Sequence, residues 1–566
     1  MKIETQSPLQ LQDQWEDEGI LYIKVGFALP ASATPQPMAV HFSVPSVDLH
    51  SHWSPQTDPM RKLGPNWNKK TTQSRFAHGL PLHAVLSADG QNRLTVAVSD
   101  VKTNLTLATG ISEERAELDC KITFFTQLTA PIAQYSAVLR IDRRDIPFYE
   151  AISQGAAWLD RDPAPVPEAA KAPVNSLWYS FHQDLNSEEI LEECRLSRPY
   201  GLETVILDDG WQTEDNNRGY AYCGDWELAT AKIPDMRKLS EGIHSLGMKL
   251  MLWYSVPYVG IHSKNYSRFG GKYLYFDQRR GVGALDPRYP EVRAYLADQY
   301  ETAVTQWDLD GLKLDFVNAF KLTPETPSDD PARDICSLEE AIEALLQEVM
   351  TRLHRCKPDL LVEFRQGYIG PALRRYGNML RAGDCPNDWL CNKTAVLDLR
   401  LTSGKTPVHS DMLMWHPEEP AQIAALQLAA VLFAVPQISV RLAKISPEQQ
   451  KMLGFYLDFW RKNRDTLLEG RLKLWDPQAL YSKASVTRGD QTVAILYTDT
   501  TFCRETDSTT LINCGKTRKL YLDGFGGCAY RILDCMGNHL AAGTLEALTA
   551  LSVPTAGMVE IEGHKR

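Results

Sequence analysis

Lysine and aspartate stand two residues apart in the segment Gly311–Phe316 of this 566-residue chain. The segment has the composition of a short buried strand. Alternate side chains of a strand share a face, so Lys313 and Asp315 point one way and the two neighbouring leucines point the other. A cation beside a carboxylate keeps it ionised, as a carboxylate nucleophile must be. The simpler alternative is that Asp315 caps the next helix or forms an ordinary ion pair.

Two further acidic motifs follow apolar segments. Asp208 and Asp209 come directly after Thr204–Leu207, and Asp384 comes soon after Met379–Arg381. Adjacent carboxylates repel each other, so they are costly unless a function needs them. Carboxylates form charge-assisted hydrogen bonds, for example to sugar hydroxyls, and a nearby tryptophan supplies an apolar wall. A metal site or a helix cap is the alternative, although no histidine stands at a suitable spacing for a metal.

The elements that would position these residues alternate between short apolar strands and helical stretches. Eight such units over about 290 residues favour a (β/α)8 barrel, in which functional side chains lie at the carboxyl ends of the strands. An open doubly wound sheet is the alternative, but no glycine-rich phosphate loop follows the first strand. The predicted strands are Ser176–Tyr179, Thr204–Leu207, Lys249–Trp253, Gly311–Leu314, Leu360–Glu363, Met379–Arg381, Met412–Trp415 and Gln437–Val440.

Acidic residues at most strand ends, with aromatic residues close by, are typical of a carbohydrate pocket. Asp315 after the fourth strand and Asp384 after the sixth suit a pair that faces across such a pocket. A retaining glycosidase uses two carboxylates about 5–5.5 Å apart, one as nucleophile and the other as acid and then base. Asp388 is the alternative acid/base, but Asp384 lies nearer the strand end.

Two β-rich regions flank the barrel. Residues 1–165 carry short segments rich in β-branched and aromatic residues, which predicts an all-β region, a β-sandwich. Prolines in residues 160–173 indicate a linker. Strand patterns return in residues 466–566 and predict a small antiparallel β-domain. The expected fold class is multidomain α/β, with a central (β/α)8 TIM barrel over residues 166–465.

The composition argues against several classes of function. The chain is 43% hydrophobic and 23% charged, which is ordinary for a soluble globular protein, and it is too long for one hydrophobic core. The net charge of −11, without a basic stripe, argues against nucleic acid and anionic membranes as partners. Glutamine and proline interrupt the apolar run Ala421–Val440, so we expect a buried helix leading into a strand there.

Cysteine usage and the first residues point to the compartment. The 11 cysteines are scattered and contain no CxxC, so they are typical of reduced cytosolic thiols and not of a disulfide framework or a zinc site. The segment Met1–Pro8 is polar and is not followed by the apolar stretch of a signal peptide. We therefore expect a cytoplasmic protein.

In its motifs and their order, the chain resembles the α-galactosidases of glycoside hydrolase family 36, the melibiase and raffinose-synthase-like group. Asp208-Asp209-Gly210-Trp211 resembles the family's paired-aspartate motif. Gly224-Asp225-Trp226 and Lys232-Ile233-Pro234 resemble two tripeptides that follow it. Lys313-Leu314-Asp315 resembles the Lys-Trp-Asp nucleophile motif. Gly383-Asp384, with Asp388, resembles Ser-Asp-x-x-Asp with one extra residue in the spacing.

The resemblance implies roles for the matching residues. Asp315 would be the nucleophile and Asp384 the acid/base, while Asp208 and Asp209 would hold the 4- and 6-hydroxyls of galactose. The other expected substrate contacts are Trp211, Trp226, Trp253, Lys313, Arg365, Arg381 and Asp388. No metal and no other cofactor is expected, because two carboxylates carry the chemistry.

The chain departs from the family pattern in three places. Arg365 stands where the family has a cysteine, Arg381 stands where it has a pocket tryptophan, and Trp253–Pro257 lacks two glutamates. Two arginines beside one sugar would suit a carboxylate or sulfonate on the ligand. The alternative is that both arginines pair with Glu363 or Asp388 and never touch substrate.

The leading hypothesis is a retaining exo-α-glycosidase similar to α-galactosidases, acting on an oligosaccharide or small α-glycoside. The alternatives are a raffinose-synthase-like transglycosylase, a glycosidase for an anionic or otherwise modified α-sugar, and a catalytically inactive sugar-binding protein. No nucleic acid or membrane is expected as a partner, and a homo-oligomer stays open. Asp411 and His409 would either contact substrate or tie the seventh loop, and Tyr179 would reach the pocket floor.

Overall fold

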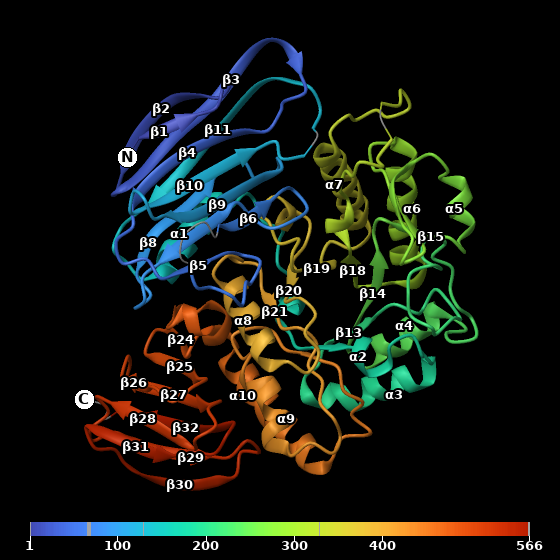
Figure 1. Cartoon of the computed structure of the whole chain (residues 1–566). Helices are drawn as coiled ribbons and strands as arrows, with labels where there is room; N and C mark the ends of the chain where they lie inside the picture. Colours follow the sequence, from blue (N-terminus) through green and yellow to red (C-terminus); the bar gives the residue numbers. More distant parts are fainter. Residues whose placement is uncertain (1, 65–68, 128, 328, 564–566) are drawn as a thin grey trace.

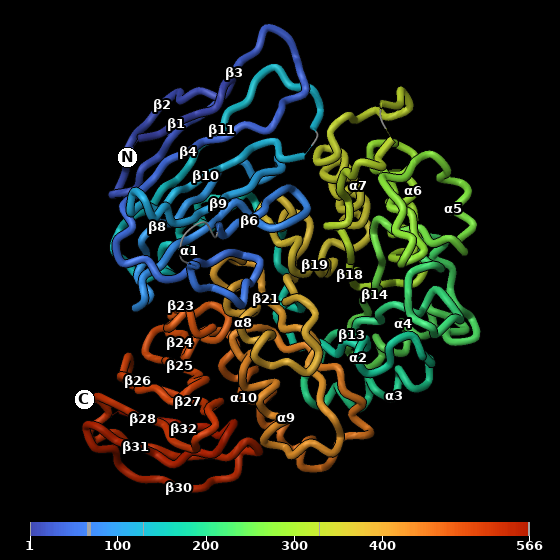
Figure 2. The backbone as a smooth tube through the Cα atoms, viewed as in Figure 1, coloured from blue at the N-terminus to red at the C-terminus, as the bar shows by residue number. Residues whose placement is uncertain are grey.

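The computed structural model describes residues 2–64, 69–127, 129–327 and 329–563. A β-sandwich, a central barrel and a C-terminal β-domain follow one another along the chain, and the two terminal domains lie on the same side of the barrel (Figure 1). The backbone trace places both ends of the chain on that side (Figure 2). The predicted fold class is confirmed. Within the described residues, no helix has the length and apolar character needed to cross a lipid bilayer.

Two antiparallel sheets form the N-terminal sandwich and enclose an apolar core that includes Val40, Leu107 and Ile122. One sheet has the order β1-β4-β10-β9-β6 and the other β2-β3-β11-β8-β7-β5. In β10, buried and half-buried residues alternate, as expected for a strand with one face on the core. The strands are β1 (Ile3–Thr5), β2 (Gln10–Asp17), β3 (Ile20–Ala33), β4 (Met38–Pro45), β5 (Ser51–Trp53), β6 (Lys70–Ser74), β7 (Leu82–Leu86), β8 (Asn92–Val98), β9 (Leu105–Ser112), β10 (Glu117–Phe124) and β11 (Ile132–Asp142).

The prediction that residues 1–165 are all β was wrong in one segment. Helix α1 (Phe148–Leu159) follows β11 and packs against β7 and β8. Its buried residues, among them Phe148, Ile152 and Leu159, recur at the three- and four-residue spacing of an amphipathic helix. The helix continues the apolar core of the sandwich toward the barrel.

Eight parallel strands form the barrel, in the order β21-β20-β19-β18-β14-β13-β12-β22. Isolated parallel bridges, His409 with Val435 and Leu413 with Ile438, bring the two ends of this sheet together. The strands are β12 (Val174–Ser176), β13 (Thr204–Leu207), β14 (Lys249–Ser255), β18 (Gly311–Asp315), β19 (Leu361–Arg365), β20 (Met379–Arg381), β21 (Val408–His409) and β22 (Gln437–Ile438).

Two predicted barrel strands were misplaced. The first strand ends at Ser176, and most of the predicted Ser176–Tyr179 continues into helix α2 (Trp178–Phe181). The seventh strand is β21 and not Met412–Trp415, of which only Leu413 takes part in a bridge. The apolar run continues past the strand because the segment after it is also buried, so hydrophobicity alone did not mark the strand.

Helices on the outside of the barrel begin with polar caps. The Asn186 side chain accepts from two backbone N–H groups at the start of α3, Ser337 caps α7, and Ser446 with Gln449 forms a capping box on α10. The helices after α2 are α3 (Ser187–Ser197), α4 (Met236–Ser245), α6 (Pro290–Trp307), α7 (Leu338–Cys356), α8 (Trp389–Arg400), α9 (Ala421–Ala429) and α10 (Pro447–Glu469).

A small insertion and the C-terminal domain complete the chain. The insertion follows β14 and contains β15 (Tyr258–Gly260), α5 (Lys264–Arg268), β16 (Tyr273–Asp277) and β17 (Val282–Leu285). The C-terminal sheets are mostly antiparallel, but β25 pairs with β27 and β26 with β28 in parallel. Their strands are β23 (Arg471–Leu474), β24 (Lys483–Arg488), β25 (Gln491–Leu496), β26 (Thr501–Cys503), β27 (Ser508–Asn513), β28 (Lys519–Asp523), β29 (Ala529–Leu533), β30 (His539–Thr544), β31 (Leu548–Ser552) and β32 (Gly557–Glu562).

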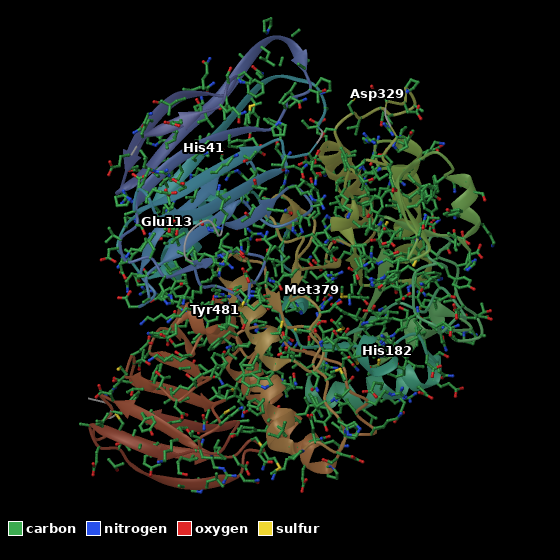
Figure 3. All side chains as sticks on the ribbon, viewed as in Figure 1. His41, Glu113, His182, Asp329, Met379 and Tyr481 are labelled. Carbon is green, nitrogen blue, oxygen red and sulfur yellow. The ribbon has the colours of Figure 1, made fainter. Side chains whose placement is uncertain are left out.

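Asp398 on α8 is the point at which all three parts of the chain meet. Its Oδ1 accepts hydrogen bonds from Trp53 Nε1 at 2.8 Å and from the Tyr481 hydroxyl at 2.5 Å, and its Oδ2 lies 2.6 Å from Arg61 Nη2. Trp53 and Arg61 belong to the sandwich, and Tyr481 belongs to the C-terminal domain, where it faces the rest of the molecule (Figure 3). The carboxylate is 1% exposed, so these contacts are shielded from water.

Asp398→Ala should lower the stability of the whole assembly, because it leaves the buried Arg61 without its counter-charge. Breaking one partner of a buried pair costs about 3–5 kcal/mol. We expect a lower thermal unfolding midpoint in scanning calorimetry. The matched control is Asp458→Ala, which removes an exposed partner of Arg461 on α10 and should cost less than about 1 kcal/mol. Equal midpoints for the two variants would contradict this role for Asp398.

Candidate active site

Parallel pairing of β18, β19 and β20 gathers charged residues at the carboxyl end of the barrel. Lys313 is the partner of Glu363 across β18 and β19, and Arg365 is the partner of Arg381 across β19 and β20. Asp315 is the last residue of β18, next to the end of β14. Because neighbouring parallel strands end at the same edge, four charged side chains and the candidate nucleophile meet there.

The two oxygens of Asp315 have different surroundings. Oδ1 accepts hydrogen bonds from Phe316 N at 2.7 Å, from Arg365 Nε at 2.8 Å and from the Tyr368 hydroxyl at 3.0 Å. Within the described residues, Oδ2 accepts one hydrogen bond, from Trp253 Nε1 at 3.1 Å. Oδ2 is therefore the oxygen with capacity to form a new bond, while Oδ1 is held in place.

Asp315 stays ionised although it is buried. Burial alone would raise the pKa of Asp315, but Arg365, then Lys313 and the Trp253 hydrogen bond, outweigh it and hold that pKa well below its usual range. The sequence predicted Lys313 as the cation beside Asp315. In the structure Lys313 Nζ lies 2.6 Å from Asp208 Oδ2, and the direct partner of Asp315 is Arg365.

Asp384 is placed differently from Asp315. Its side chain is 51% exposed, and Oδ1 lies 2.8 Å from Arg381 Nη2. Burial would raise the pKa of Asp384, but Arg381 and Arg365 lower it, while the negative charge of Asp315 opposes them. Asp384 is therefore the more accessible of the two candidate catalytic carboxylates.

Arg381 lies beneath the site and is surrounded by carboxylates. It is 1% exposed, and its nitrogens lie 2.5 Å from Asp411 Oδ1, 2.8 Å from Asp384 Oδ1 and 3.3 Å from Glu363 Oε1. The alternative pairing of Arg381 with Glu363 is present, and a contact between Arg381 and substrate stays a prediction. The reason for the pairing is burial, since a guanidinium removed from water requires protein counter-charges.

Asp208 and Asp209 lie after β13 with different partners. Asp208 binds Lys313, whereas Asp209 accepts hydrogen bonds from the side-chain amides of Gln183 at 2.8 Å and Gln212 at 2.6 Å. Burial, together with the negative charge of Asp208, raises the pKa of Asp209 to about 6, and the hydrogen bonds from Gln212 and Gln183 offset this only in part. Both carboxylates are almost fully buried in the structure.

Aromatic rings stack behind the carboxylates. Trp226 lies 5.9 Å from Trp211 and 6.1 Å from Trp253 between ring centroids. Trp211 is completely buried and its indole N–H donates to the Trp253 carbonyl, so it supports the wall from behind and offers no surface to a ligand. Tyr220, which sequence reasoning missed, stacks on Trp253, and besides burial the charges of Asp315 and Asp209 raise its pKa.

Asp388 has a structural contact and no contact with the candidate catalytic residues. It is the N-cap of α8 and accepts a hydrogen bond from Cys391 N at 3.0 Å. Asp225 of the Gly-Asp-Trp motif similarly accepts from the backbone at the start of α5. Both residues therefore act as helix caps, a role that helix-cap chemistry in the sequence could have indicated.

Asp411, Tyr179 and Tyr368 contact the residues of the site, whereas His182 contacts an exposed arginine. Asp411 binds Arg381 and accepts from the Tyr179 hydroxyl at 3.1 Å, so Tyr179 does reach the floor of the site. The Tyr368 hydroxyl bonds Asp315, and no sequence pattern marked that tyrosine. His182, on the side of α2 (Figure 3), bonds the exposed Arg218. Among the described residues, no group of three or more histidine, cysteine or acidic side chains is arranged to hold a metal ion.

Comparison with known proteins agrees with this geometry. Residues 169–370 match the melibiase family. The α-galactosidase AgaA of Geobacillus stearothermophilus is 24% identical over 250 residues, which are 41% of this chain and 32% of that protein. The matched region is thus about a third of that relative's length. The predicted likeness to the melibiase and α-galactosidase group is confirmed over this region of the chain.

Solved structures extend the likeness to the whole architecture. An α-galactosidase from Lactobacillus brevis superposes with a TM-score of 0.66 and 16% identity, over 97% of this chain and 78% of that one. A variant of AgaA in complex with raffinose has a TM-score of 0.66 and 15% identity, over 96% of this chain and 79% of that one. At such identities these structures establish the shared fold.

Asp209 should make stability depend on pH. The pKa of Asp209, about 6 in the folded protein, lies above the ordinary value of 3.8. Above pH 6 the ionisation of this buried carboxyl group lowers the free energy of unfolding, whereas below pH 4 the group is protonated and this destabilisation is absent. Relative to Asp209→Asn, the native protein should lose about 2 kcal/mol of stability as the pH rises from 4 to 7. Unfolding midpoints of both proteins from pH 4 to pH 7 measure the difference. A constant offset, without this pH dependence, would contradict the raised pKa.

Proposed function

We propose that the protein is a retaining exo-α-glycosidase that hydrolyses a terminal α-linked sugar, with galactose as the favoured sugar. The observation that carries this proposal is the contrast between two carboxylates at one barrel mouth. Asp315 is buried, ionised and rigidly held, with Oδ2 open to a new bond, whereas Asp384 is half exposed on the solvent side. A buried, ionised carboxylate suits a nucleophile, and an accessible carboxylate can exchange protons with solvent and so serve as acid and then base.

In the proposed first step, Asp315 Oδ2 attacks the anomeric carbon as its bond to the leaving oxygen breaks. Asp384, which must first take up a proton against the lowering of its pKa by Arg381 and Arg365, gives that proton to the leaving oxygen, and the sugar becomes a covalent ester of Asp315. In the second step, water attacks the same carbon while Asp384 accepts its proton, which restores both carboxyl groups. Donors to Asp315 Oδ1 from Arg365, Tyr368 and Phe316 N stabilise the carboxylate as it departs.

The proposed sugar ligands lie around Lys313. Asp208, Asp209 and Lys313 offer charged donors and acceptors to ring hydroxyls, and Trp226 and Trp253 form an apolar wall behind them. One related α-galactosidase of known structure holds raffinose. By this likeness, we expect an oligosaccharide or small α-galactoside as substrate.

The charges of the site favour a neutral sugar over an anionic one. Arg381 is neutralised by protein carboxylates, and Arg365 by Asp315. The carboxylates outnumber the cations at the strand ends, six (Asp208, Asp209, Asp315, Glu363, Asp384 and Asp411) against four (Lys232, Lys313, Arg365 and Arg381). A carboxylate or sulfonate on the substrate would add to this negative excess.

The cysteines support a reducing compartment. All 11 cysteines lie in described parts of the chain and are free, and seven of them are buried. Free thiols in this number are typical of cytosolic proteins. We therefore place the proposed activity in the cytoplasm.

Asp315→Ala should abolish turnover of an aryl α-galactoside, with kcat falling at least about 10³-fold, because no other group supplies the nucleophile. Azide, a small anion that fits the vacated space, should restore product formation as a β-galactosyl azide of inverted configuration. Steady-state kinetics and NMR of the product check both expectations. Activity of this variant within tenfold of the native enzyme, without azide, would refute the proposed role of Asp315.

A neutral α-galactoside should be a better substrate than its anionic counterparts. We expect kcat/KM for the aryl α-galactoside to exceed that for the α-galacturonide and the α-sulfoquinovoside by at least about tenfold, because of the negative excess at the strand ends. A panel of aryl α-glycosides that share one leaving group measures this directly. Preference for either anionic sugar would show that Arg365 leaves Asp315 to bind substrate.

A further inference from the structure

The segment that carries Asp384 has no regular structure of its own. It lies between β20 and α8, and two side chains hold its backbone on either side of Asp384. Gln366 Oε1 accepts a hydrogen bond from Gly383 N at 2.9 Å, and Asp411 Oδ2 accepts one from Cys385 N at 2.7 Å. The position of the Asp384 carboxylate therefore depends on these two contacts as well as on its ion pair with Arg381.

The Gln366 side chain is itself oriented by the N-terminal sandwich. A primary amide has one accepting end and one donating end. Because Oε1 accepts from Gly383, Nε2 faces the other way, where it donates to the Thr57 hydroxyl at 3.1 Å. Thr57 lies in the loop between β5 and β6, 309 residues before Gln366. The amide is thus fixed between the acid/base segment and a different domain.

The loop that carries Thr57 is anchored on both sides of that residue. Trp53 before it and Arg61 after it both bind the carboxylate of Asp398. Asp398 belongs to α8, the helix that begins four residues after Asp384 at its cap, Asp388. The two ends of the sandwich loop therefore bind α8, the helix that follows the Asp384 segment. Thr57, between those ends, binds Gln366, which holds Gly383 at the beginning of the segment.

A second segment of the sandwich, residues 75–79, contacts the loops that follow β18 and β19. Gly79 N donates to the Gly367 carbonyl at 2.6 Å, directly after Gln366. The Arg75 guanidinium donates to the carbonyls of Phe320 and Asn318, in the loop that follows Asp315. These contacts place the sandwich firmly over the end of β19 and make the Thr57 contact part of a larger fixed interface.

We propose that Gln366 is a positioning residue for Asp384, and that the N-terminal sandwich, through Thr57, completes the acid/base side of the site. The inference rests on the proposed function. Gln366 fixes Gly383 and thereby sets the direction from which Asp384 meets the leaving oxygen. Thr57 keeps the Gln366 amide from turning its donor end toward Gly383.

Kinetics with a series of aryl α-galactosides separates positioning of the acid from a general loss of structure. Leaving groups of high pKa need a proton from Asp384, whereas dinitrophenolate leaves without one. For Gln366→Met we expect kcat/KM to fall about 10–100-fold on the phenyl galactoside and less than about threefold on the dinitrophenyl galactoside. Thr57→Val should show the same trend, with a loss of about 3–10-fold on the phenyl galactoside.

Two further variants serve as controls. Thr57→Ser keeps the accepting hydroxyl and should stay within about twofold of the native enzyme on every substrate. Thr71→Val makes the same change as Thr57→Val at an exposed position on β6 and should have no effect. Equal losses on all leaving groups in Gln366→Met, or no loss on any, would overturn the proposal, because a merely structural residue does not select for leaving-group pKa.

Hydrogen exchange keeps the test independent of turnover. The Gly383 amide should exchange faster in Gln366→Met and in Thr57→Val than in the native protein, while amides of β18 stay unchanged. Unchanged amide exchange at residues 382–388 in both variants would refute the proposal that Gln366 and Thr57 hold this segment. If the native protein turned over no α-glycoside, the proposed function would fail, and the exchange measurement would still decide whether Gln366 and Thr57 hold this segment.

Discussion

A buried guanidinium fixes the relative positions of the strand ends. Arg381 ends β20 and meets Glu363 of β19, Asp411 after β21 and Asp384 of its own loop. A cation without water is stable only among counter-charges, and three neighbouring carboxylates repel one another unless a cation joins them. The guanidinium therefore needs the three carboxylates, and the carboxylates need the guanidinium. The strand ends therefore cannot separate without leaving a buried charge unpaired.

Burial acts to raise the pKa of both Asp209 and Asp315, and the partner of each carboxylate decides the outcome. Asp209 has amide partners, and its pKa rises to about 6. Asp315, equally removed from water, has the guanidinium of Arg365 beside it, and its pKa falls well below the usual range. Neutral donors replace the hydrogen bonds that a buried carboxylate loses with water, whereas a cation also offsets the negative charge of the carboxylate. The site thus holds one carboxylate that titrates near pH 6 and one that remains ionised.

Much of this arrangement followed from the sequence, and the exceptions have a common cause. Alternation along β18 placed Lys313 and Asp315 on one face, and parallel pairing predicted that Asp208 and Asp384 would lie at the same end of the barrel. Which cation pairs with which acid depends on distances between strands, so Arg365 took the place expected of Lys313. Local patterns also say nothing of depth, so Trp211 was expected at the surface of the pocket and lies behind it. Thr57 could not be predicted at all, because its contact spans 309 residues of sequence.

The pairing of Arg365 with Asp315 has opposite effects on the two proposed chemical steps. A carboxylate stabilised by a cation is a weaker nucleophile in the first step and a better leaving group in the second. The geometry reduces this conflict, because three donors meet Oδ1 while Oδ2 accepts one neutral hydrogen bond from Trp253 within the described residues. The attacking oxygen is thus the less stabilised of the two. In the proposed mechanism an arginine at this position therefore serves the nucleophile, and its charge is engaged by Asp315 rather than by an anionic sugar.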